Sequence, residues 1–447
     1  MRSGKITFKD LTLALDCGIF EGTQGLFEGL QIPSELPYDS LAHWPPMTYR
    51  NNFAPTAETL ADFSSFLEKE NTSKGPKELQ PWIPFCEGRC SFCYFPICCE
   101  KNIYDTYVEA LKKALGFYAE KPYVESSVFR ELYVGGGTPS VLSEKQIGEL
   151  LDFCRGNFNL DDECQIKFTA ATASLSFKKI RFLSNYKVSQ LDVGIQTFDE
   201  NLRTTLRLKD KSKTAKAKLR EIRNSEMHVS IDLLYNLPGQ TLEQWERDID
   251  QALELEVESV DCYPLEMYPE TPLGKKILAG ELPQIDDCKK ELEMSLMASK
   301  IFRENGYFPT CHNRYSRVAS DREEPSSEVV GTGAGFFMGH IGSFQYSDFE
   351  DVKEYLNSVQ AGHFPIGRLT SISPVDEIRK AMMMLYVHVP VNVKEFNERF
   401  GKSPDEAFPE AMEKLRRKGL IVEENNEIRL SEKGDPWRFN IAWEFFK

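Results

Sequence analysis

Residues 84–95 read PFCEGRCSFCYF and place three cysteines, Cys86, Cys90 and Cys93, within eight residues. Their spacing is C-x3-C-x2-C, and no fourth cysteine stands nearby at matching spacing. A [4Fe–4S] cluster normally takes four thiolates, one for each iron. Three thiolates on one loop would therefore leave one iron without a protein ligand and free to bind another molecule.

Two other roles for this cysteine stretch fit the sequence less well. A structural zinc site needs four ligands, commonly from two separated C-x2-C or H-x3-H pairs, and no second pair of either kind exists in this chain. A disulfide framework is disfavoured because the three cysteines crowd one loop and no secretory signal precedes them. The stretch therefore favours an iron–sulfur cluster.

Composition narrows the class of protein. The chain has 447 residues, 41% of them hydrophobic, and a net charge of −15. This charge argues against binding to a nucleic acid backbone, which needs a basic surface. No apolar run reaches the roughly 20 residues of a membrane span. Eleven cysteines without a secretion signal indicate a reducing compartment. We therefore expect a cytoplasmic protein that does not bind nucleic acid.

Residues 78–284 alternate short apolar runs with amphipathic stretches. The expected strands are Trp82–Phe85, Phe129–Val134, Gln165–Ala170, Gln190–Ile195, His228–Leu234 and Val257–Pro264. The expected helices between them are Asp105–Tyr118, Ser143–Arg155, Phe177–Leu183, Thr214–Arg223 and Thr241–Leu255. This alternation predicts an α/β fold, a partial (β/α)6 barrel of parallel strands with its site at their C-terminal ends.

Three further segments flank the predicted barrel. Residues 1–77 form an N-terminal extension with a helix over Thr56–Glu70, and our working hypothesis is a flap over the barrel mouth. Residues 285–372 are expected to form a lid region with one helix, one strand and a glycine-rich turn, GTGAG at 331–335. Residues 373–447 are expected to form a winged-helix-like domain with helices Pro374–Tyr386, Val393–Phe400 and Pro404–Lys418 and a hairpin Leu420–Leu430 turning at Asn425-Asn426. The acidic third helix favours a packing role over DNA binding.

Polar and glycine residues stand where the predicted strands end. The second strand runs into GGGTPS at 135–140, where glycine lets backbone groups approach a ligand closely. Gln196 ends the fourth strand, and Asp232 lies within the apolar fifth strand. A buried carboxylate is costly without a partner, and a ribose diol would be one such partner. A neighbouring backbone amide would be another.

These motifs together resemble the oxygen-independent coproporphyrinogen III oxidase-like branch of the radical S-adenosylmethionine (SAM) superfamily, from about residue 80 to the C-terminus. The resemblance implies a [4Fe–4S] cluster that reduces SAM to a 5′-deoxyadenosyl radical. It implies that the cluster ligands are Cys86, Cys90 and Cys93. It further implies that the residues near SAM are Phe92, Gly136, Gly137, Thr138, Gln196 and Asp232.

The chain departs from the decarboxylases of that branch at four positions. Phe95 stands where those enzymes carry a further cysteine, and Gln80-Pro81-Trp82 replaces their Tyr-x-His. An acidic residue usual at the end of the third strand is replaced near Thr169. Arg207 or Lys209 could stand in for an arginine after the fourth strand. The first two differences weaken a decarboxylase interpretation.

We therefore expect a methyltransferase of class C that uses two SAM molecules to methylate an sp2 carbon of a conjugated ring such as menaquinone. An apolar acceptor would suit the stretch Phe336-Phe337-Met338 and the run Met382–Met384, although the latter fits core packing better. No catalytic base can be assigned, and the candidates are Glu266, His312 and Tyr315.

The alternatives are tetrapyrrole chemistry, either coproporphyrinogen dehydrogenation or haem ring opening, and a non-catalytic haem chaperone. The resemblance also implies a low-potential electron donor such as flavodoxin or ferredoxin. A quinone acceptor would in addition require peripheral contact with a membrane.

Overall fold

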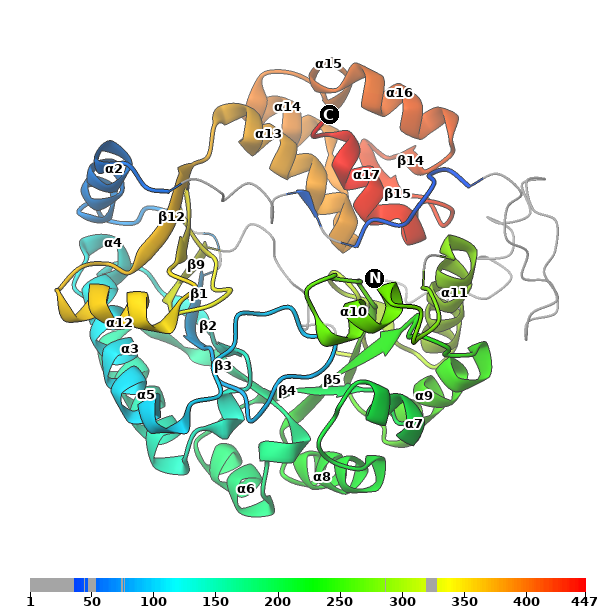
Figure 1. Cartoon of the computed structure of the whole chain (residues 1–447). Helices are drawn as coiled ribbons and strands as arrows, with labels where there is room; N and C mark the ends of the chain where they lie inside the picture. The colour runs from blue at the N-terminus through cyan, green and yellow to red at the C-terminus, as the bar shows by residue number, and fades with distance from the viewer. Residues whose placement is uncertain are drawn as a thin grey trace.

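The computed structural model describes residues 36–43, 45–46, 54–73, 75, 77–285, 287–318 and 328–447. It confirms the α/β fold class. A curved sheet lies inside an outer layer of helices, and the C-terminal domain lies across the opening between the two edges of the sheet (Figure 1). The N-terminal extension predicted for residues 1–77 lies largely outside the described residues.

All six predicted barrel strands are present and parallel. They are β1 Lys77–Ile83, β2 Phe129–Gly136, β3 Leu160–Ala170, β4 Gln190–Gln196, β5 His228–Tyr235 and β6 Ser259–Pro264, paired in chain order. The first strand differs from the prediction, because it begins five residues earlier and ends before Pro84. The cysteine stretch therefore starts immediately after the first strand, at its C-terminal end.

The predicted barrel helices are also present and pack on the outside of the sheet (Figure 1). They are α3 Tyr104–Ala119, α5 Glu144–Asn157, α6 Phe177–Asn185, α8 Ser212–Asn224 and α9 Leu242–Glu254. Two of them start with a capping box, in which Ser143 and Thr241 accept hydrogen bonds from the third helical N–H. The other helices in the barrel and the region that follows are α4 Pro122–Glu125, α7 Glu200–Thr205, α10 Pro272–Leu278, α11 Cys288–Glu304 and α12 Val352–Gln360.

Residues 285–372 add strands to both edges of the sheet, where the sequence predicted a single strand. The order within the described residues is β12-β11-β10-β9-β1-β2-β3-β4-β5-β6-β8-β7. The added strands are β7 Phe308–Pro309, β8 Arg314–Ser316, β9 Glu328–Thr332, β10 Gly339–Ile341, β11 Phe344–Asp348 and β12 Ile366–Ser371. Their short length hid them, because two to six residues give little periodicity.

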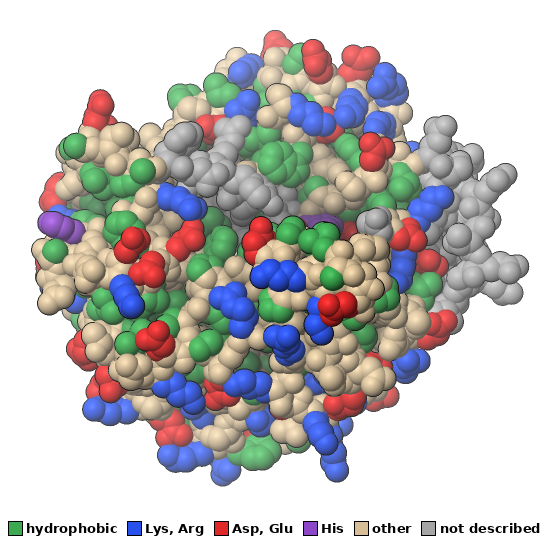
Figure 2. Space-filling view, in the orientation of Figure 1, with side chains coloured by type: hydrophobic (Ala, Val, Ile, Leu, Met, Phe, Trp, Pro, Cys, Tyr) green, Lys and Arg blue, Asp and Glu red, His purple; other side chains and the backbone are tan. Residues whose placement is uncertain are grey.

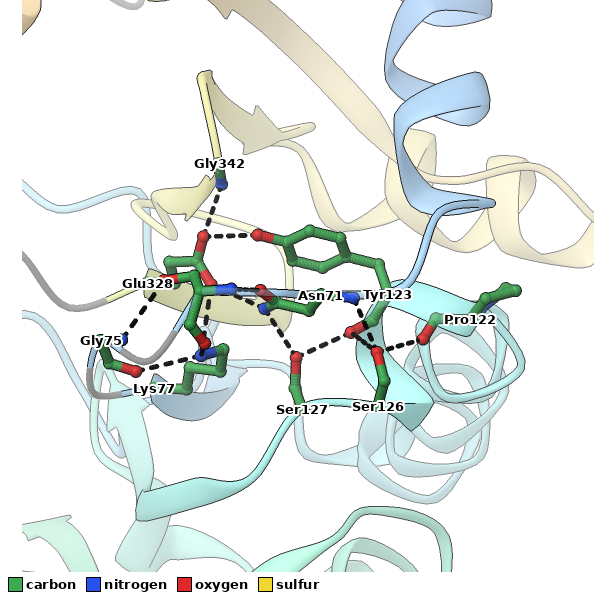
Figure 3. A network of polar contacts seen from close by, with 10 residues as sticks. Asn71, Gly75, Lys77, Pro122, Tyr123, Ser126, Ser127, Glu328 and Gly342 are labelled. Carbon is green, nitrogen blue, oxygen red and sulfur yellow. Dashed lines mark hydrogen bonds and ion pairs between the residues drawn. The ribbon is translucent and has the colours of Figure 1, made fainter.

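Strand β9 is tied to the barrel by a buried polar network around Glu328 (Figure 3). The Glu328 carboxylate accepts hydrogen bonds from Tyr123 Oη at 2.6 Å, Gly342 N at 2.9 Å and Asn71 Nδ2 at 3.1 Å. Lys77 Nζ lies 3.9 Å from the same carboxylate. The network fixes the start of β9 against β1, and so places the glycine-rich turn that follows β9.

The C-terminal domain has a hydrophobic core of its own. Its elements are α13 Pro374–Met383, β13 Val391–Asn392, α14 Val393–Phe400, α15 Pro404–Ala407, α16 Pro409–Arg417, β14 Ile421–Glu424, β15 Glu427–Leu430 and α17 Arg438–Glu444. The predicted hairpin is confirmed, with Asn425 and Asn426 both at positive φ. The predicted helix Pro404–Lys418 is wrong: it breaks before Pro409, because proline lacks the N–H that a helix interior needs.

The described part of the N-terminal extension contacts both the barrel and the C-terminal domain. Helix α2, Ala57–Leu67, is capped by Thr56 as predicted and packs against the barrel side. Tyr38 packs against Trp437 of the C-terminal domain, with ring centroids 5.7 Å apart. No helix within the described ranges combines the length and apolarity needed to cross a membrane. Acidic and basic side chains mingle over the face shown in Figure 2, with a group of Lys and Arg around α10.

Candidate functional site

A cavity of about 470 Å³ opens at the C-terminal ends of the parallel strands. All nine residues singled out from the sequence line it: Cys86, Phe92, Cys90, Cys93, Gly136, Gly137, Thr138, Gln196 and Asp232. They come from the loop after β1 and from the ends of β2, β4 and β5. Their individual roles stay predictions, but the fold brings them to one place.

The cysteine loop is held by backbone contacts to its surroundings. Cys86 N donates to Cys98 O, and Cys98 N donates to Pro84 O, which pins the two ends of the loop together. Ser91, between the second and third cysteines, donates from N to Leu206 O and accepts from Leu273 N. The loop is thus anchored to the end of α7 and the start of α10.

The glycine run after β2 packs directly against this loop. Gly137 N donates to Ile83 O at 2.8 Å, and Thr138 N donates to Phe85 O at 2.7 Å. Gly136 has φ +123°, and a Cβ there would lie 2.2 Å from Ile83 O. A Cβ on Gly137 would lie 3.0 Å from Cys86 Sγ. Glycine is required at this contact because the strand end and the cysteine loop touch backbone to backbone.

The three thiols are half-buried and converge on the cavity. Burial raises the pKa of Cys86 to about 12 and that of Cys90 to about 11. The Thr138 hydroxyl lies 3.1 Å from Cys86 Sγ, and this contact lowers the pKa of Cys86 and partly offsets the effect of burial. Such thiols become thiolates only when a bound metal replaces the proton.

The donor set fits a polynuclear cluster better than a single ion. Among the described residues, no three His, Cys, Asp or Glu side chains converge closely enough to hold one metal ion. In an iron–sulfur cluster each thiolate binds a different iron, so the sulfurs need not meet at one point. Three soft thiols on one loop, with hydrogen-bonding groups opposite, suit such a cluster.

The floor of the barrel carries more negative than positive charge. Asp192, Asp232 and Asp261 come from three adjacent strands, and Arg314 on β8 is the cation beside them. Arg314 lies 2.8 Å from Asp261 and 3.7 Å from Asp192. Burial, and then the carboxylates of Asp261 and Asp192, raise the pKa of Asp232 well above its usual range. A ligand hydroxyl or cation at Asp232 would relieve this crowding.

Gln196 stands at an irregular strand end. It has φ +67°, and a register shift separates it from Gly194 in the pairing with β5. The buried Arg203 holds this turn by donating to Ile195 O at 3.1 Å and Thr197 O at 2.8 Å. Gly194 leaves room for the amide, because a Cβ there would lie 2.7 Å from Gln196 Nε2. The amide is thereby turned into the cavity.

Some other sequence candidates reach the cavity and some do not. Lys209 lines it and donates to Glu87 O at 2.7 Å, whereas Arg207 is not among its lining residues. Thr169 lines it and pairs with Tyr133 Oη at 2.9 Å. Glu266 also lines it.

The other two candidate bases do not line the cavity. His312 packs against Tyr386 and Phe439, and Tyr315 stacks on Phe302 in the core. The residues between them, Asn313 and Arg314, line the cavity in their place.

One cavity residue from the N-terminal extension was missed by sequence reasoning. His43 lies between Glu266 and Glu291, with Nδ1 3.1 Å from the first and Nε2 2.6 Å from the second. Burial lowers its pKa, but the hydrogen bonds to both carboxylates raise the pKa of His43 to about 9. A lone histidine in a Pro-rich stretch carries no pattern that could have revealed this position.

Four aromatic side chains were also missed as a group: Tyr94, Phe95 and Tyr268 line the cavity, and Phe336 packs against the first two at its mouth. We call this group, Tyr94, Phe95, Tyr268 and Phe336, the aromatic rim. Tyr94 stacks on Tyr268 with ring centroids 4.1 Å apart, and Phe95 stacks on Phe336 at 5.2 Å. The apolar lid expected at 336–338 is only partly right, and the burial of Met382 and Met383 agrees with the core-packing interpretation preferred for that run. Phe336 and Met338 are exposed, but the side chains buried in cores are Phe337, Met382 and Met383.

Comparisons with known proteins agree with this geometry. Residues 81–252 match the profile of the Radical SAM superfamily, and residues 372–437 match that of the HemN C-terminal domain. The chain is 27% identical over 363 residues to the heme chaperone HemW of Bacillus subtilis, covering 79% of this chain and 94% of that protein. It is 23% identical over 330 residues to the anaerobilin synthase of Escherichia coli O157:H7, covering 72% and 73%.

A solved structure shows the same fold over almost the whole chain. Coproporphyrinogen III oxidase (HemN) from Escherichia coli superposes with a TM-score of 0.78 at 20% identity. The match covers 91% of this chain and 96% of that one. The added strands and the C-terminal domain are therefore part of a shared architecture.

Proposed function

We propose that this chain, a radical SAM protein of the HemN-like branch, binds a [4Fe–4S] cluster and SAM and acts on a tetrapyrrole. One observation supports the binding of the cluster and SAM. The three thiols of the cysteine loop surround one cavity together with the glycine run, Gln196 and Asp232. When bound, such a cluster supplies one electron to the sulfonium of SAM.

Different residues of the cavity would bind the cluster and SAM. The cluster ligands would be Cys86, Cys90 and Cys93. The backbone of Gly136 and Gly137 lies close enough to the cysteine loop to meet a ligand held there. Asp232 offers a carboxylate that gains from a hydroxyl partner, and Gln196 presents an amide beside it. These are the contacts that a nucleoside with an amino acid tail requires.

The proposal of a tetrapyrrole ligand is supported by the names of the relatives. Those names refer to heme, anaerobilin and coproporphyrinogen III. Each of these relatives matches both the barrel and a large part of this chain. The aromatic rim at the cavity mouth would suit the face of a macrocycle.

Methyl transfer to a conjugated ring, which the sequence favoured, becomes the second candidate. None of the relatives reported above has methyl transfer in its name, so the comparisons give it no support. One observation keeps it open: Asp192 and Asp261 share the single cation Arg314, and this surplus of negative charge would suit the sulfonium of a second SAM. The menaquinone acceptor has no separate support.

Product analysis separates the possible activities. The protein would be reconstituted with iron and sulfide under anaerobic conditions, reduced, and incubated with SAM and protoporphyrin IX or its iron complex. We expect 5′-deoxyadenosine that increases with the macrocycle and no S-adenosylhomocysteine. Formation of S-adenosylhomocysteine would establish methyl transfer instead. Tight macrocycle binding with no consumption of SAM would indicate a chaperone.

A further inference from the structure

We propose that the aromatic rim binds the flat face of a fully conjugated macrocycle where the cavity opens, and that the protein therefore selects porphyrins over porphyrinogens. This inference rests on the proposed tetrapyrrole function and narrows its ligand. A porphyrin is a flat π-system with two faces for stacking. A porphyrinogen has saturated bridges and is puckered, so it offers no such face.

The rim is a continuous aromatic surface formed by three separate segments. Tyr94 and Phe95 follow the third cysteine, Tyr268 follows β6, and Phe336 follows the glycine-rich turn. Besides the two stacked pairs, Tyr94 meets Phe336 edge-on at 5.6 Å and Phe95 edge-on at 5.0 Å. All four rings are therefore within contact distance of a neighbour.

Among the described residues, Phe336 is the exposed member of the rim, and Tyr94, Phe95 and Tyr268 are half-buried. Phe336 is 39% exposed and Met338 is 37% exposed, and Met267 beside Tyr268 is 37% exposed. On the face shown in Figure 2, hydrophobic side chains lie beside α10, near the boundary with the C-terminal domain. An exposed phenyl ring grouped with further apolar side chains beside a ligand cavity fits a binding surface, whereas a single exposed apolar residue would need no such explanation.

Backbone packing holds the rim rigid. Gly335 has φ +102°, and a Cβ there would lie 3.3 Å from Pro96 O and 3.5 Å from Trp82 Nε1. The glycine-rich turn therefore sits directly on the cysteine loop and sets Phe336 against Phe95. Arg89 donates to Cys93 O and Phe95 O, each at 3.1 Å, and fixes the loop from the other side. A preformed surface costs little ordering entropy when a ligand binds.

The size of the cavity places the macrocycle at its opening. A cavity of about 470 Å³ is within the range of roughly 300–1,000 Å³ that holds one drug-sized ligand. SAM is a ligand of that size, and the cluster needs further room at the thiols. A tetrapyrrole cannot share this space, so its ring must lie where the cavity opens.

The charges around the cavity argue against a ligand with many carboxylates. Four cations line the described cavity, and each already has partners. Arg203 binds Asp210 and two carbonyls, and Arg314 binds Asp261. His43 binds Glu266 and Glu291, and Lys209 binds Glu87. A propionate that points into the cavity would therefore have to compete with these partners, which favours a ligand with few carboxylates on that side.

Three macrocycles test the inference on the cluster-reconstituted protein. Protoporphyrin IX is flat with two carboxylates, coproporphyrin III is flat with four, and coproporphyrinogen III is puckered with four. Affinities would be measured anaerobically, by Soret absorbance for the porphyrins and by equilibrium dialysis for the porphyrinogen. We expect protoporphyrin IX to bind at least about 10-fold more tightly than coproporphyrinogen III, with coproporphyrin III between them.

Variants locate the binding surface. Phe336→Ala and Phe95→Ala should each weaken protoporphyrin binding about 3- to 10-fold, the size of one lost aromatic contact. Phe336→Trp should retain binding because it keeps a flat ring. Phe177→Ala is the matched control, since Phe177 is 46% exposed on α6 and does not line the cavity. Melting curves and iron content would show that each variant is folded.

The results separate failure of this inference from failure of the proposed function. If the wild-type protein binds protoporphyrin IX and Phe336→Ala and Phe95→Ala bind it equally well, the rim is not the binding surface. Equal or tighter binding of coproporphyrinogen III would overturn the selection for flat rings. If the wild-type protein binds none of the three macrocycles, the proposed tetrapyrrole function itself fails.

Discussion

The two ends of the cavity are built in different ways. The cluster end, around Cys86, Cys90 and Cys93, is formed by backbone contacts so close that only glycine fits at Gly136. The mouth is formed by side chains from distant segments, namely the aromatic rim and His43. The first end depends on residues that motifs reveal, while the second depends on how far-apart segments pack. The two ends could therefore change independently, and the proposed ligand preference depends on the second.

Replacing Cys90 with alanine should disturb the cluster end and leave the mouth almost unchanged. This is the largest difference that we expect between the two ends. Cys90→Ala should reduce bound iron and lower SAM cleavage at least about 100-fold, because a cluster iron loses its ligand. Protoporphyrin binding should change less than about twofold, since the rim contacts are intact. Iron assay, 5′-deoxyadenosine yield and Soret titration measure the three effects.

The matched control for this change is Cys164→Ala. Cys164 is a half-buried thiol on β3 that does not line the cavity. It should retain iron and activity. Full SAM cleavage by Cys90→Ala would contradict the assignment of the cluster to this loop.

Disturbing the backbone contact between Gly136 and Ile83 should have the next largest effect. Gly136→Ala would push a Cβ to within 2.2 Å of Ile83 O at φ +123°, so the strand end and the cysteine loop must move apart. We expect a loss of at least about 2 kcal/mol in the free energy of unfolding, together with reduced cluster occupancy. Denaturant unfolding and iron content test both.

A second glycine provides the comparison. Gly156 lies in the exposed last turn of α5, and a Cβ there would meet nothing within 4 Å. Gly156→Ala should leave the cluster unchanged and stabilise the protein by up to about 1 kcal/mol. Equal destabilisation by both substitutions would show that the contact at Gly136 is not special.

The sequence predicted which residues gather at the cluster end because the signals there are local, while the cluster itself stays a prediction. The six parallel strands, the cysteine spacing and the glycine run all lie within short windows, and Asp232 stood out as a carboxylate in an apolar strand. Asp192 in the neighbouring strand carried the same signal and was overlooked. The break before Pro409 could also have been predicted from proline alone.

The sequence could not predict the mouth, because its geometry arises from long-range packing. Strand β9 pairs with β1 across about 250 residues of chain, and that pairing places Phe336 on Phe95. The contact between His43 and Glu291 spans 248 positions. Neither Phe336 nor His43 belongs to a motif or a periodic pattern that would identify the residue it contacts. Ligand selection therefore had to be inferred from the structure.

The smallest expected effect concerns His43, which tests whether the N-terminal segment belongs to the mouth. An unfolded histidine titrates near 6.5, while the two carboxylates raise the folded pKa to about 9. The contacts of His43 therefore stabilise the fold fully below pH 6.5 and lose this contribution as the pH rises through 9. His43→Gln should cost about 1–3 kcal/mol at pH 6.5 and almost nothing at pH 10.

Melting curves of wild-type protein and His43→Gln from pH 6.5 to pH 10 measure this difference. His363→Gln serves as the control, because His363 is exposed after α12 and a change there should not depend on pH in the same way. A cost for His43→Gln that stays constant or grows toward pH 10 would mean that His43 is not held as an imidazolium between Glu266 and Glu291. Because Glu266 also accepts a hydrogen bond from Tyr268 of the aromatic rim, a confirmed pH dependence would link the N-terminal segment directly to the surface proposed for the macrocycle.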